Sequence, residues 1–188
     1  VTGVQTCALP ICLGHQRVWG LHQDSGGTLW AATQIGLSYA TDEALDGSGP
    51  AFQTPDAVFN EIYTDVFQAG DGSVWSSTAG QGVVRVDGEH VVRLSTQDGL
   101  AHDFVYAIHE DFQGGLWFGS ADGRLTRYDS QRLLNLSGRH GLDAESVSAL
   151  LPEDGALWIG TDQGLRVRRN GQLAAVGHEA GLRTRITS

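Results

Sequence analysis

The chain has 188 residues, with 12 basic and 22 acidic side chains, and its formal net charge is −10 when histidine is neutral. An acidic chain of this kind argues against the phosphate backbone of a nucleic acid, or an anionic membrane surface, as the binding partner. Glycine accounts for 26 residues, about twice its usual share, which indicates many tight turns in a soluble all-β protein.

The chain begins with VTGVQTCALPI (1–11), which resembles the translation of a short-read sequencing adapter. We therefore expect residues 1–12 to be an artefactual or disordered leader outside any domain. Cys7 and Cys12 lie in or beside it, so the cysteines predict no disulfide, metal site or redox compartment. The chain has no Met, and all of its basic residues are Arg. We expect a metagenomic fragment from a GC-rich bacterial genome.

One short pattern then recurs four times, as GTLWAAT (27–33), GSVWSST (72–78), GGLWFGS (114–120) and GALWIGT (155–161). Its tryptophans, Trp30, Trp75, Trp117 and Trp158, are 45, 42 and 41 residues apart. A period near 40 that keeps its phase over four copies indicates a repeat architecture. Each copy contains short β-like segments, so the pattern predicts an all-β β-propeller fragment of about four four-stranded antiparallel blades.

The expected domain covers residues 13–188, with the start of a further blade at 183–188. The four blades are predicted at 18–54, 62–95, 105–137 and 147–177. Alternation and turn signals predict their strands at 18–24, 28–33, 36–40 and 51–54; 62–68, 73–78, 82–87 and 90–95; 105–111, 116–120, 124–129 and 133–137; and 147–153, 156–161, 164–170 and 172–177.

The recurrent residues have structural roles in this interpretation. Each Trp is a large ring suited to filling the wedge between adjacent sheets, on the second strand and largely buried. Small residues follow two positions later, where a neighbour approaches closely: Ala32, Ser77, Gly119 and Gly160. One hydroxyl per blade comes next and is expected to bond the following turn: Thr33, Thr78, Ser120 and Thr161.

The third repeat, E-D-x-x-G-G-L-W-F-G-S (110–120) followed by D-G-x-L-T-R-Y-D (122–129), resembles the two-component regulator propeller repeat. The resemblance covers 13–188 and is best in the third and fourth copies; the second departs with SVWSST and the first with AAT. It implies an arc of a seven-bladed propeller in a bacterial signal-transduction receptor, periplasmic or otherwise extracytoplasmic. It also implies a downstream transmembrane helix and a histidine kinase, response-regulator or diguanylate cyclase module.

Catalytic motifs are missing from the sequence, and we expect no catalytic residue, no metal and no cofactor. The carboxylate pairs at 110–111 and 153–154 precede hairpin turns, where Asp bonds its own backbone. His22 and His109 both lie eight residues before a repeat Trp, which favours a strand role. Two alternatives stay open: a propeller enzyme similar to streptogramin lyases or quinoproteins, with a His/Glu pair and metal or a quinone pocket on the channel face, and a protein-binding scaffold.

One set of polar residues recurs in the connectors between blades, near the expected channel mouth: Gln16, Glu61, Asp103, Glu145 and Arg185. They are candidate ligand-binding residues, or caps of their own turns. An acidic rim suits a hydroxyl-rich ligand such as a saccharide, or a cationic peptide. The expected partner is thus a small molecule, a saccharide or a protein, without nucleic acid or direct membrane contact in this segment, in a parent receptor that forms a dimer.

Overall fold

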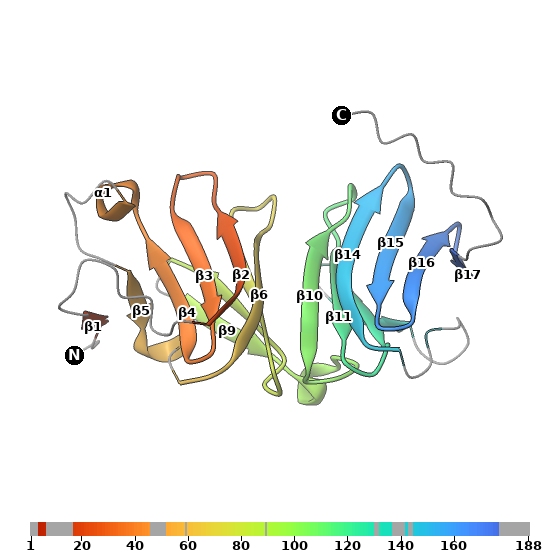
Figure 1. The fold of residues 1–188 in the computed structure, drawn as a ribbon, viewed down its shortest axis with the longest axis horizontal. Helices are drawn as coiled ribbons and strands as arrows, with labels where there is room; N and C mark the ends of the chain where they lie inside the picture. The colour runs from red at the N-terminus through yellow and green to blue at the C-terminus, as the bar shows by residue number, and fades with distance from the viewer. Residues whose placement is uncertain are drawn as a thin grey trace.

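The computed structural model describes residues 4–6, 17–45, 52–58, 60–88, 90–129, 132–136, 142 and 145–176. These residues form four antiparallel sheets, each built from consecutive strands, in an open arc (Figure 1). We number the sheets as blades 1 to 4. This arrangement confirms the predicted β-propeller fragment.

Blade 1 contains β2 (Val18–Gln23), β3 (Leu29–Thr33), β4 (Gly36–Ala40) and β5 (Gln53–Pro55). Blade 2 contains β6 (Tyr63–Gln68), β7 (Val74–Thr78), β8 (Val83–Asp87) and β9 (His90–Leu94). Blade 3 contains β10 (Val105–Glu110), β11 (Leu116–Ser120), β12 (Leu125–Tyr128) and β13 (Leu133–Leu136). Blade 4 contains β14 (Val147–Glu153), β15 (Ala156–Thr161), β16 (Gly164–Arg169) and β17 (Gln172–Ala175). All of these strands begin and end within two residues of the predicted ranges.

Helices play a small part in the described residues. They comprise α1 (Asp42–Leu45) and two 3-10 turns, Asp56–Val58 and Thr96–Asp98. No helix in the described part of the chain is long and apolar enough to cross a membrane.

The structure differs from the sequence-based expectation at the start of the chain. Strand β1 (Val4–Thr6) pairs antiparallel with β5, Val4 facing Pro55, and adds a fifth strand to the sheet of blade 1. We expected residues 1–12 to lie outside the blades. An outer strand presents unpaired backbone N–H and C=O groups, so a short extended segment can pair with it whatever its side chains.

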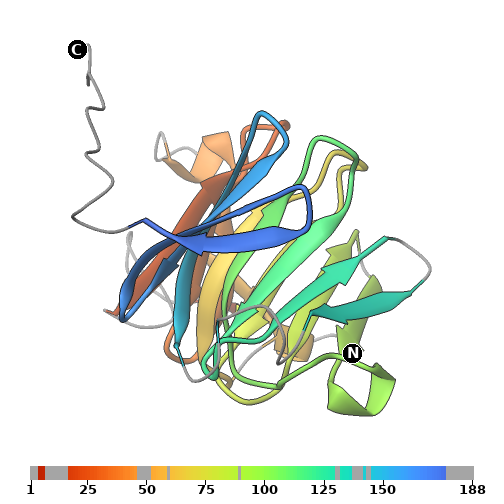
Figure 2. The same ribbon diagram turned by 90° about the vertical axis from the view of Figure 1, so that its right-hand side faces the viewer.

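The hydrophobic core lies between blades and not within any one of them. Three clusters of buried side chains join blade 1 to 2, 2 to 3 and 3 to 4. The fully buried Tyr63, Phe118 and Ile159 belong one to each cluster. Figure 2 shows the sheet of blade 4 (blue) packed beside that of blade 3 (green). Each blade is therefore stabilised by its neighbours, as in other repeat proteins.

The repeat tryptophans all lie on the second strand of their blade, and Trp30, Trp75 and Trp117 face the following blade. Trp75 and Trp117 are only 2% and 4% exposed, as predicted, but Trp30 and Trp158 are half-buried. Trp30 packs on the buried cluster between blades 1 and 2, which includes Val86. Trp158 lies on the face of blade 4 that no described blade covers. The neighbouring blade therefore decides how far each ring is buried.

Three of the four repeat hydroxyls bond the turn that follows. The Oγ1 atoms of Thr33, Thr78 and Thr161 donate to the carbonyl oxygens of Gly36, Gly82 and Gly164, at 2.7, 2.9 and 2.8 Å. Ser120 differs, because its buried Oγ has no hydrogen-bond partner among the described residues. Nothing in the structure explains this exception.

Candidate functional site

The inner strand of each blade carries a β-bulge at the same position. In β2, β6, β10 and β14 the pairing with the second strand skips one residue. The four bulged residues are Trp19, Thr64, Tyr106 and Ser148. These strands are sheet edges, and their free edges lie side by side in the middle of the arc (Figure 1). Because a bulge redirects its side chain away from the ladder, Trp19, Tyr106 and Ser148 are exposed here, whereas the Thr64 hydroxyl bonds to Val105 and Ser77.

A second row of side chains lies two residues before the bulges, at Arg17, Ile62, Phe104 and Ser146. Their carbonyl oxygens each accept a hydrogen bond from the first N–H after the repeat hydroxyl, at Gln34, Ala79, Ala121 and Asp162, over 3.4, 2.9, 3.0 and 3.1 Å. The turn between the second and third strands thus holds this row in the same way in every blade. We call the two rows together the mouth residues.

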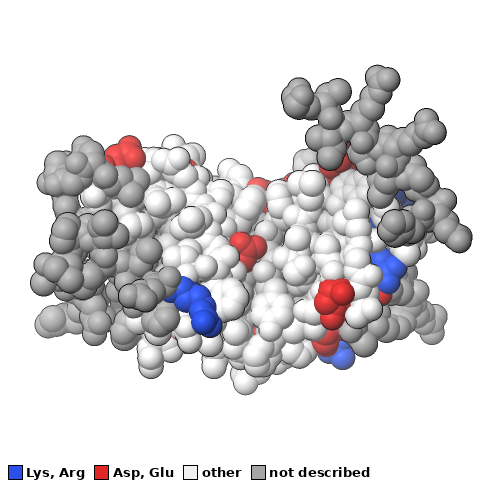
Figure 3. Space-filling model, viewed as in Figure 1, with Lys and Arg blue, Asp and Glu red and all other residues white. Residues whose placement is uncertain are grey.

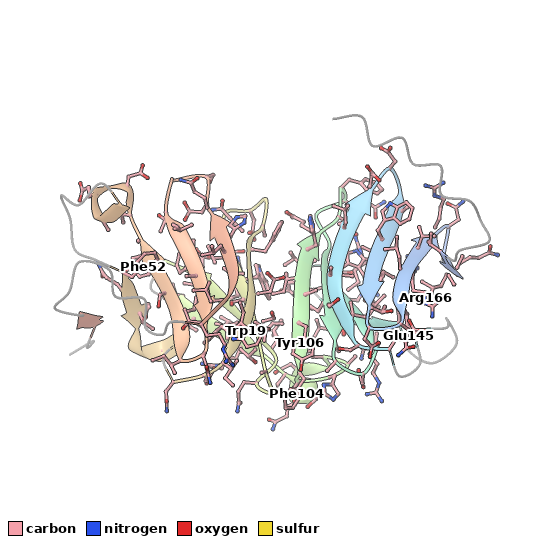
Figure 4. All side chains as sticks on the ribbon, viewed as in Figure 1. Trp19, Phe52, Phe104, Tyr106, Glu145 and Arg166 are labelled. Atoms are coloured by element: carbon pink, nitrogen blue, oxygen red, sulfur yellow. The ribbon has the colours of Figure 1, made fainter. Side chains whose placement is uncertain are left out.

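The mouth residues are strongly aromatic and open to solvent. Trp19 is 55% exposed, Phe104 43% and Tyr106 36%. Figure 4 shows these three rings at the same end of the inner strands. Over the inner strands this face carries few charged groups (Figure 3). Exposed aromatic rings gathered on one surface with few charges are typical of a binding site.

Contacts among the mouth residues fix the orientation of some of these groups. The Arg17 guanidinium carbon lies 5.8 Å from the centroid of the Trp19 ring, and the His102 ring lies 5.7 Å from that of Phe104. The Thr64 hydroxyl donates to the carbonyl oxygen of Val105, at 2.6 Å. The site therefore offers flat apolar surfaces next to a cation and hydroxyl groups.

The connector carboxylates that the sequence suggested are occupied by internal bonds. Glu61 pairs with Arg93, at 2.6 Å between Oε2 and Nη1. Asp103 accepts from the backbone N–H and the hydroxyl of Thr96, at 2.7 and 2.9 Å. Gln16 and Arg185 lie outside the described residues.

Glu145 is the most enclosed of these carboxylates. It is 9% exposed and pairs with the Arg166 guanidinium (Figure 4). The Arg166 guanidinium holds the pKa of Glu145 below its usual value, with a further contribution from the Thr161 hydroxyl. All three described connector carboxylates are thus engaged within the chain, Glu61 and Glu145 by arginines of distant strands, and their contact with a ligand stays a prediction.

The exposed mouth side chains come one residue after the predicted carboxylates. Ile62, Phe104 and Ser146 follow Glu61, Asp103 and Glu145 directly, and successive side chains in extended backbone point in opposite directions. The exposed mouth side chains therefore lie beside the predicted carboxylates in the chain and point to the opposite side. The signal that was missed is an aromatic residue at the start of an inner strand, at Trp19 and Tyr106.

A row of stacked rings continues along the channel below the mouth. The Phe67 ring lies 5.5 Å from that of His22 and 5.0 Å from that of His109, so it joins three blades. Burial lowers the pKa of His22, partly offset by Asp24. Asp65 is also buried here and accepts from the backbone N–H of Ile108, at 3.0 Å. Burial raises the pKa of Asp65.

The described part of the chain contains no group of three His, Cys, Asp or Glu side chains that could hold a metal ion.

Comparison with known proteins agrees with this architecture. Residues 99–122 match the family model described as two component regulator propeller. No curated protein sequence matches the chain.

Among solved structures, the chain is similar to the extracellular domain of the one-component system BT4673 from B. thetaiotaomicron, with 16% identity and a TM-score of 0.63 over 87% of this chain and 26% of that one. It is also similar to virginiamycin B lyase from Staphylococcus aureus, with 16% identity and a TM-score of 0.65 over 84% of this chain and 54% of that one. A third similar structure is PorZ, a surface component of the type-IX secretion system of Porphyromonas gingivalis, with 16% identity and a TM-score of 0.65 over 93% of this chain and 29% of that one. The chain thus spans between about a quarter and about half of these proteins, and the likeness concerns the fold.

Proposed function

Since the chain carries a two-component regulator propeller repeat within an arc of propeller blades, we propose that it is the ligand-sensing segment of a bacterial signal-transduction receptor. In this proposal the segment is extracytoplasmic and non-catalytic in itself. The similarity to the extracellular domain of BT4673 supports the location.

The observation that carries the proposal is the set of four bulges at one position of the inner strands. A bulge interrupts the ladder and leaves one residue unpaired, so natural proteins keep it where it re-aims a side chain. Here it presents the large, costly-to-expose rings of Trp19 and Tyr106 to the channel mouth. A bound ligand would remove these rings from water, which stabilises the complex.

The chemistry of the mouth favours a neutral ligand with flat faces and hydroxyl groups, such as a saccharide. Ring faces at Trp19, Phe104 and Tyr106 would stack on the apolar face of a sugar. The Thr64 and Ser148 hydroxyls, which donate to backbone carbonyl oxygens, would accept hydrogen bonds from the sugar, and the Arg17 guanidinium would donate them. A partner protein that inserts an apolar side chain would use the same rings.

Calorimetric titration with a panel of neutral oligosaccharides tests the ligand class. We expect at least one member to bind, and the double substitution Trp19→Ala with Tyr106→Ala to weaken that binding by about tenfold or more. Phe112→Ala is the matched control, since this ring is 75% exposed but lies at the opposite end of the inner strand. Undiminished binding by the double variant would exclude the mouth as the site.

A second candidate function follows from the similarity to virginiamycin B lyase. In that case the inner-strand histidines His22 and His109 would line a catalytic channel. Incubating the chain with a streptogramin B antibiotic and separating the products by reversed-phase liquid chromatography distinguishes the two functions, because a linear elimination product has the mass of the antibiotic but a different retention time. We expect the antibiotic to stay intact, and turnover would overturn the non-catalytic proposal.

The complete reading frame gives an independent check. We expect a transmembrane helix and a kinase, response-regulator or cyclase module downstream of the propeller.

A further inference from the structure

A pocket of about 380 Å³ lies between blades 3 and 4, far along the strands from the mouth. It is next to the turn between β10 and β11, whereas the mouth lies at the opposite end of β10. Phe112, Leu134 and Pro152 contribute its apolar wall, and Phe112 and Leu134 are 75% and 40% exposed. Both blades that form the pocket are described, so it does not result from an uncovered end of the arc.

One position on the third strand of each blade makes this pocket different from the other junctions between blades. It is the position that pairs with the residue before the Trp of the same blade, and it is occupied by Val86, Tyr128 and Arg168 in blades 2, 3 and 4. Val86 belongs to the buried cluster on which Trp30 packs, and the centroid of the Tyr128 ring lies 5.3 Å from that of Trp75. Between blades 2 and 3, where Tyr128 fills the space, the corresponding pocket has about 200 Å³.

Arg168 replaces this apolar cover with a cation. Its guanidinium carbon lies 5.4 Å from the Trp117 ring centroid. Among the described residues, no side chain forms an ion pair with Arg168 and none accepts a hydrogen bond from its guanidinium. The stacking holds the group in place, and its N–H donors are available to a ligand.

The second guanidinium of the pocket is already neutralised. Arg127 pairs with Asp111, at 2.8 Å between Nε and Oδ2. A Cβ atom at Gly115 would overlap the Arg127 guanidinium, so the absence of a side chain there allows this pair to lie against the backbone. Asp111 is the single acidic residue among those that line the pocket, against two arginines. The lining is therefore net positive within a chain of net charge −10.

We propose that this pocket binds a small monocarboxylate with a flat apolar body, with the carboxylate on Arg168 and the apolar part against Phe112 and Leu134. The planar guanidinium fork matches a carboxylate in two parallel hydrogen bonds. One uncompensated cation balances one carboxylate, whereas a dianionic phosphate would keep an unbalanced negative charge. A volume of about 380 Å³ falls in the range of small-molecule sites.

Phenylacetate and its neutral counterpart phenylacetamide are the probes for this proposal. Binding is followed by NMR through the indole N–H resonance of Trp117, a group that donates a hydrogen bond to Asp111. The loss of this resonance in Trp117→Phe assigns it. We expect phenylacetate to shift this resonance saturably. Phenylacetamide should bind at least about tenfold more weakly, because the charged hydrogen bonds are lost.

Arg168→Gln should weaken phenylacetate binding by about tenfold or more. Arg169→Gln is the matched control, since the neighbouring side chain of the same strand points to the other face, and it should bind as the unmodified chain does. Trp19→Ala should also leave phenylacetate binding unchanged, so failure of the mouth and failure of this pocket are distinguishable. No saturable shift, equal binding of acid and amide, or equal losses in the two arginine variants would each overturn the proposal.

Discussion

Asp111 organises the residues around the buried Trp117. Its Oδ1 accepts from the backbone N–H groups of Gln113 and Gly115, both at 2.9 Å, and closes the hairpin turn. Its Oδ2 accepts from the Trp117 indole and from Arg127, both at 2.8 Å. One carboxylate therefore satisfies a turn, a buried ring nitrogen and a cation.

The same network makes the free energy of unfolding depend on pH in the acidic range. Burial by itself would raise the pKa of Asp111, but hydrogen bonds from Arg127, Gly115 and Trp117 prevail and lower it to about 2. A carboxylate whose pKa is lower in the folded state than in the unfolded state, where it is about 3.9, stabilises the fold at pH values above 3.9. This stabilisation is lost as the pH falls towards 2.

We expect urea melts between pH 5 and pH 2.5 to show a falling free energy of unfolding, with at most about 2 kcal/mol from Asp111. Asp111→Asn should be less stable than the unmodified chain at pH 5 and should show a shallower fall. An unchanged slope in Asp111→Asn would contradict the assignment.

The tryptophans predict unequal losses on truncation. Trp117→Ala should lower the free energy of unfolding by about 3–5 kcal/mol, because the ring is 4% exposed between two blades. Trp158→Ala should cost less than half as much, since the described residues leave one side of its ring uncovered. Denaturant melts of both variants compare them, and a loss under about 1 kcal/mol for Trp117→Ala would show that this ring is not part of the core.

At the scale of elements, the turn between the second and third strands fixes the path of the connectors. In blade 1 the Asn60 N–H donates to the carbonyl oxygen of Ile35, at 2.7 Å. In blade 2 the Gly82 N–H donates to that of Asp103, at 2.8 Å. In blades 1 and 2 the turn therefore touches both the connector that enters the blade and the connector that leads onward.

Gly123 offers the sharpest test of this contact. Its φ is +81°, and a Cβ atom there would overlap the carbonyl oxygens of Leu142 and Glu145 in the connector to blade 4. A strained backbone conformation alone costs about 1–3 kcal/mol, and Gly123→Ala should lower the free energy of unfolding by more than this.

Gly155→Ala is the matched control for this substitution. Gly155 has a φ of +75° but no atom within 4 Å of the added Cβ, so this variant should show the cost of the backbone conformation alone. Thermal melts measure both variants, and equal losses would mean that the turn does not press on the connector.

At the scale of the whole molecule, stability passes from blade to blade. The second strands of blades 2 and 3 are buried along their whole length, whereas β16 and β17 of blade 4 are largely exposed or half-buried. Nearest-neighbour packing of this kind makes local stability depend on the number of flanking blades.

We expect amide hydrogen exchange to follow this order. Backbone amides of β7 and β11 should exchange more slowly than those of β16, because blades 2 and 3 are flanked on both faces by described blades. Mass spectrometry of peptic fragments resolves these strands. Equal protection in all four blades would indicate a single cooperative unit instead of coupled repeats.

The sequence by itself determined the number of blades, the strand positions and the second-strand placement of the tryptophans. It could do so because these features are local: Trp spacing, alternation and Gly-rich turns are repeated four times in register. The resemblance of the third repeat to a two-component regulator propeller rested on the same local pattern, and the family match covers residues 99–122 within that region.

Only the tertiary structure decided which side chains reach the channel mouth and which reach the pocket. Glu61, Asp103 and Glu145 find cationic or turn partners, while the bulges turn Trp19 and Tyr106 outward. A one-residue skip in strand pairing leaves no local sequence pattern, yet it changes the direction of a side chain. The burial of Trp30 and the cover of Trp117 by Arg168 likewise depend on a blade about 40 residues away. Local patterns therefore fixed the scaffold, and packing between blades placed the chemistry on it.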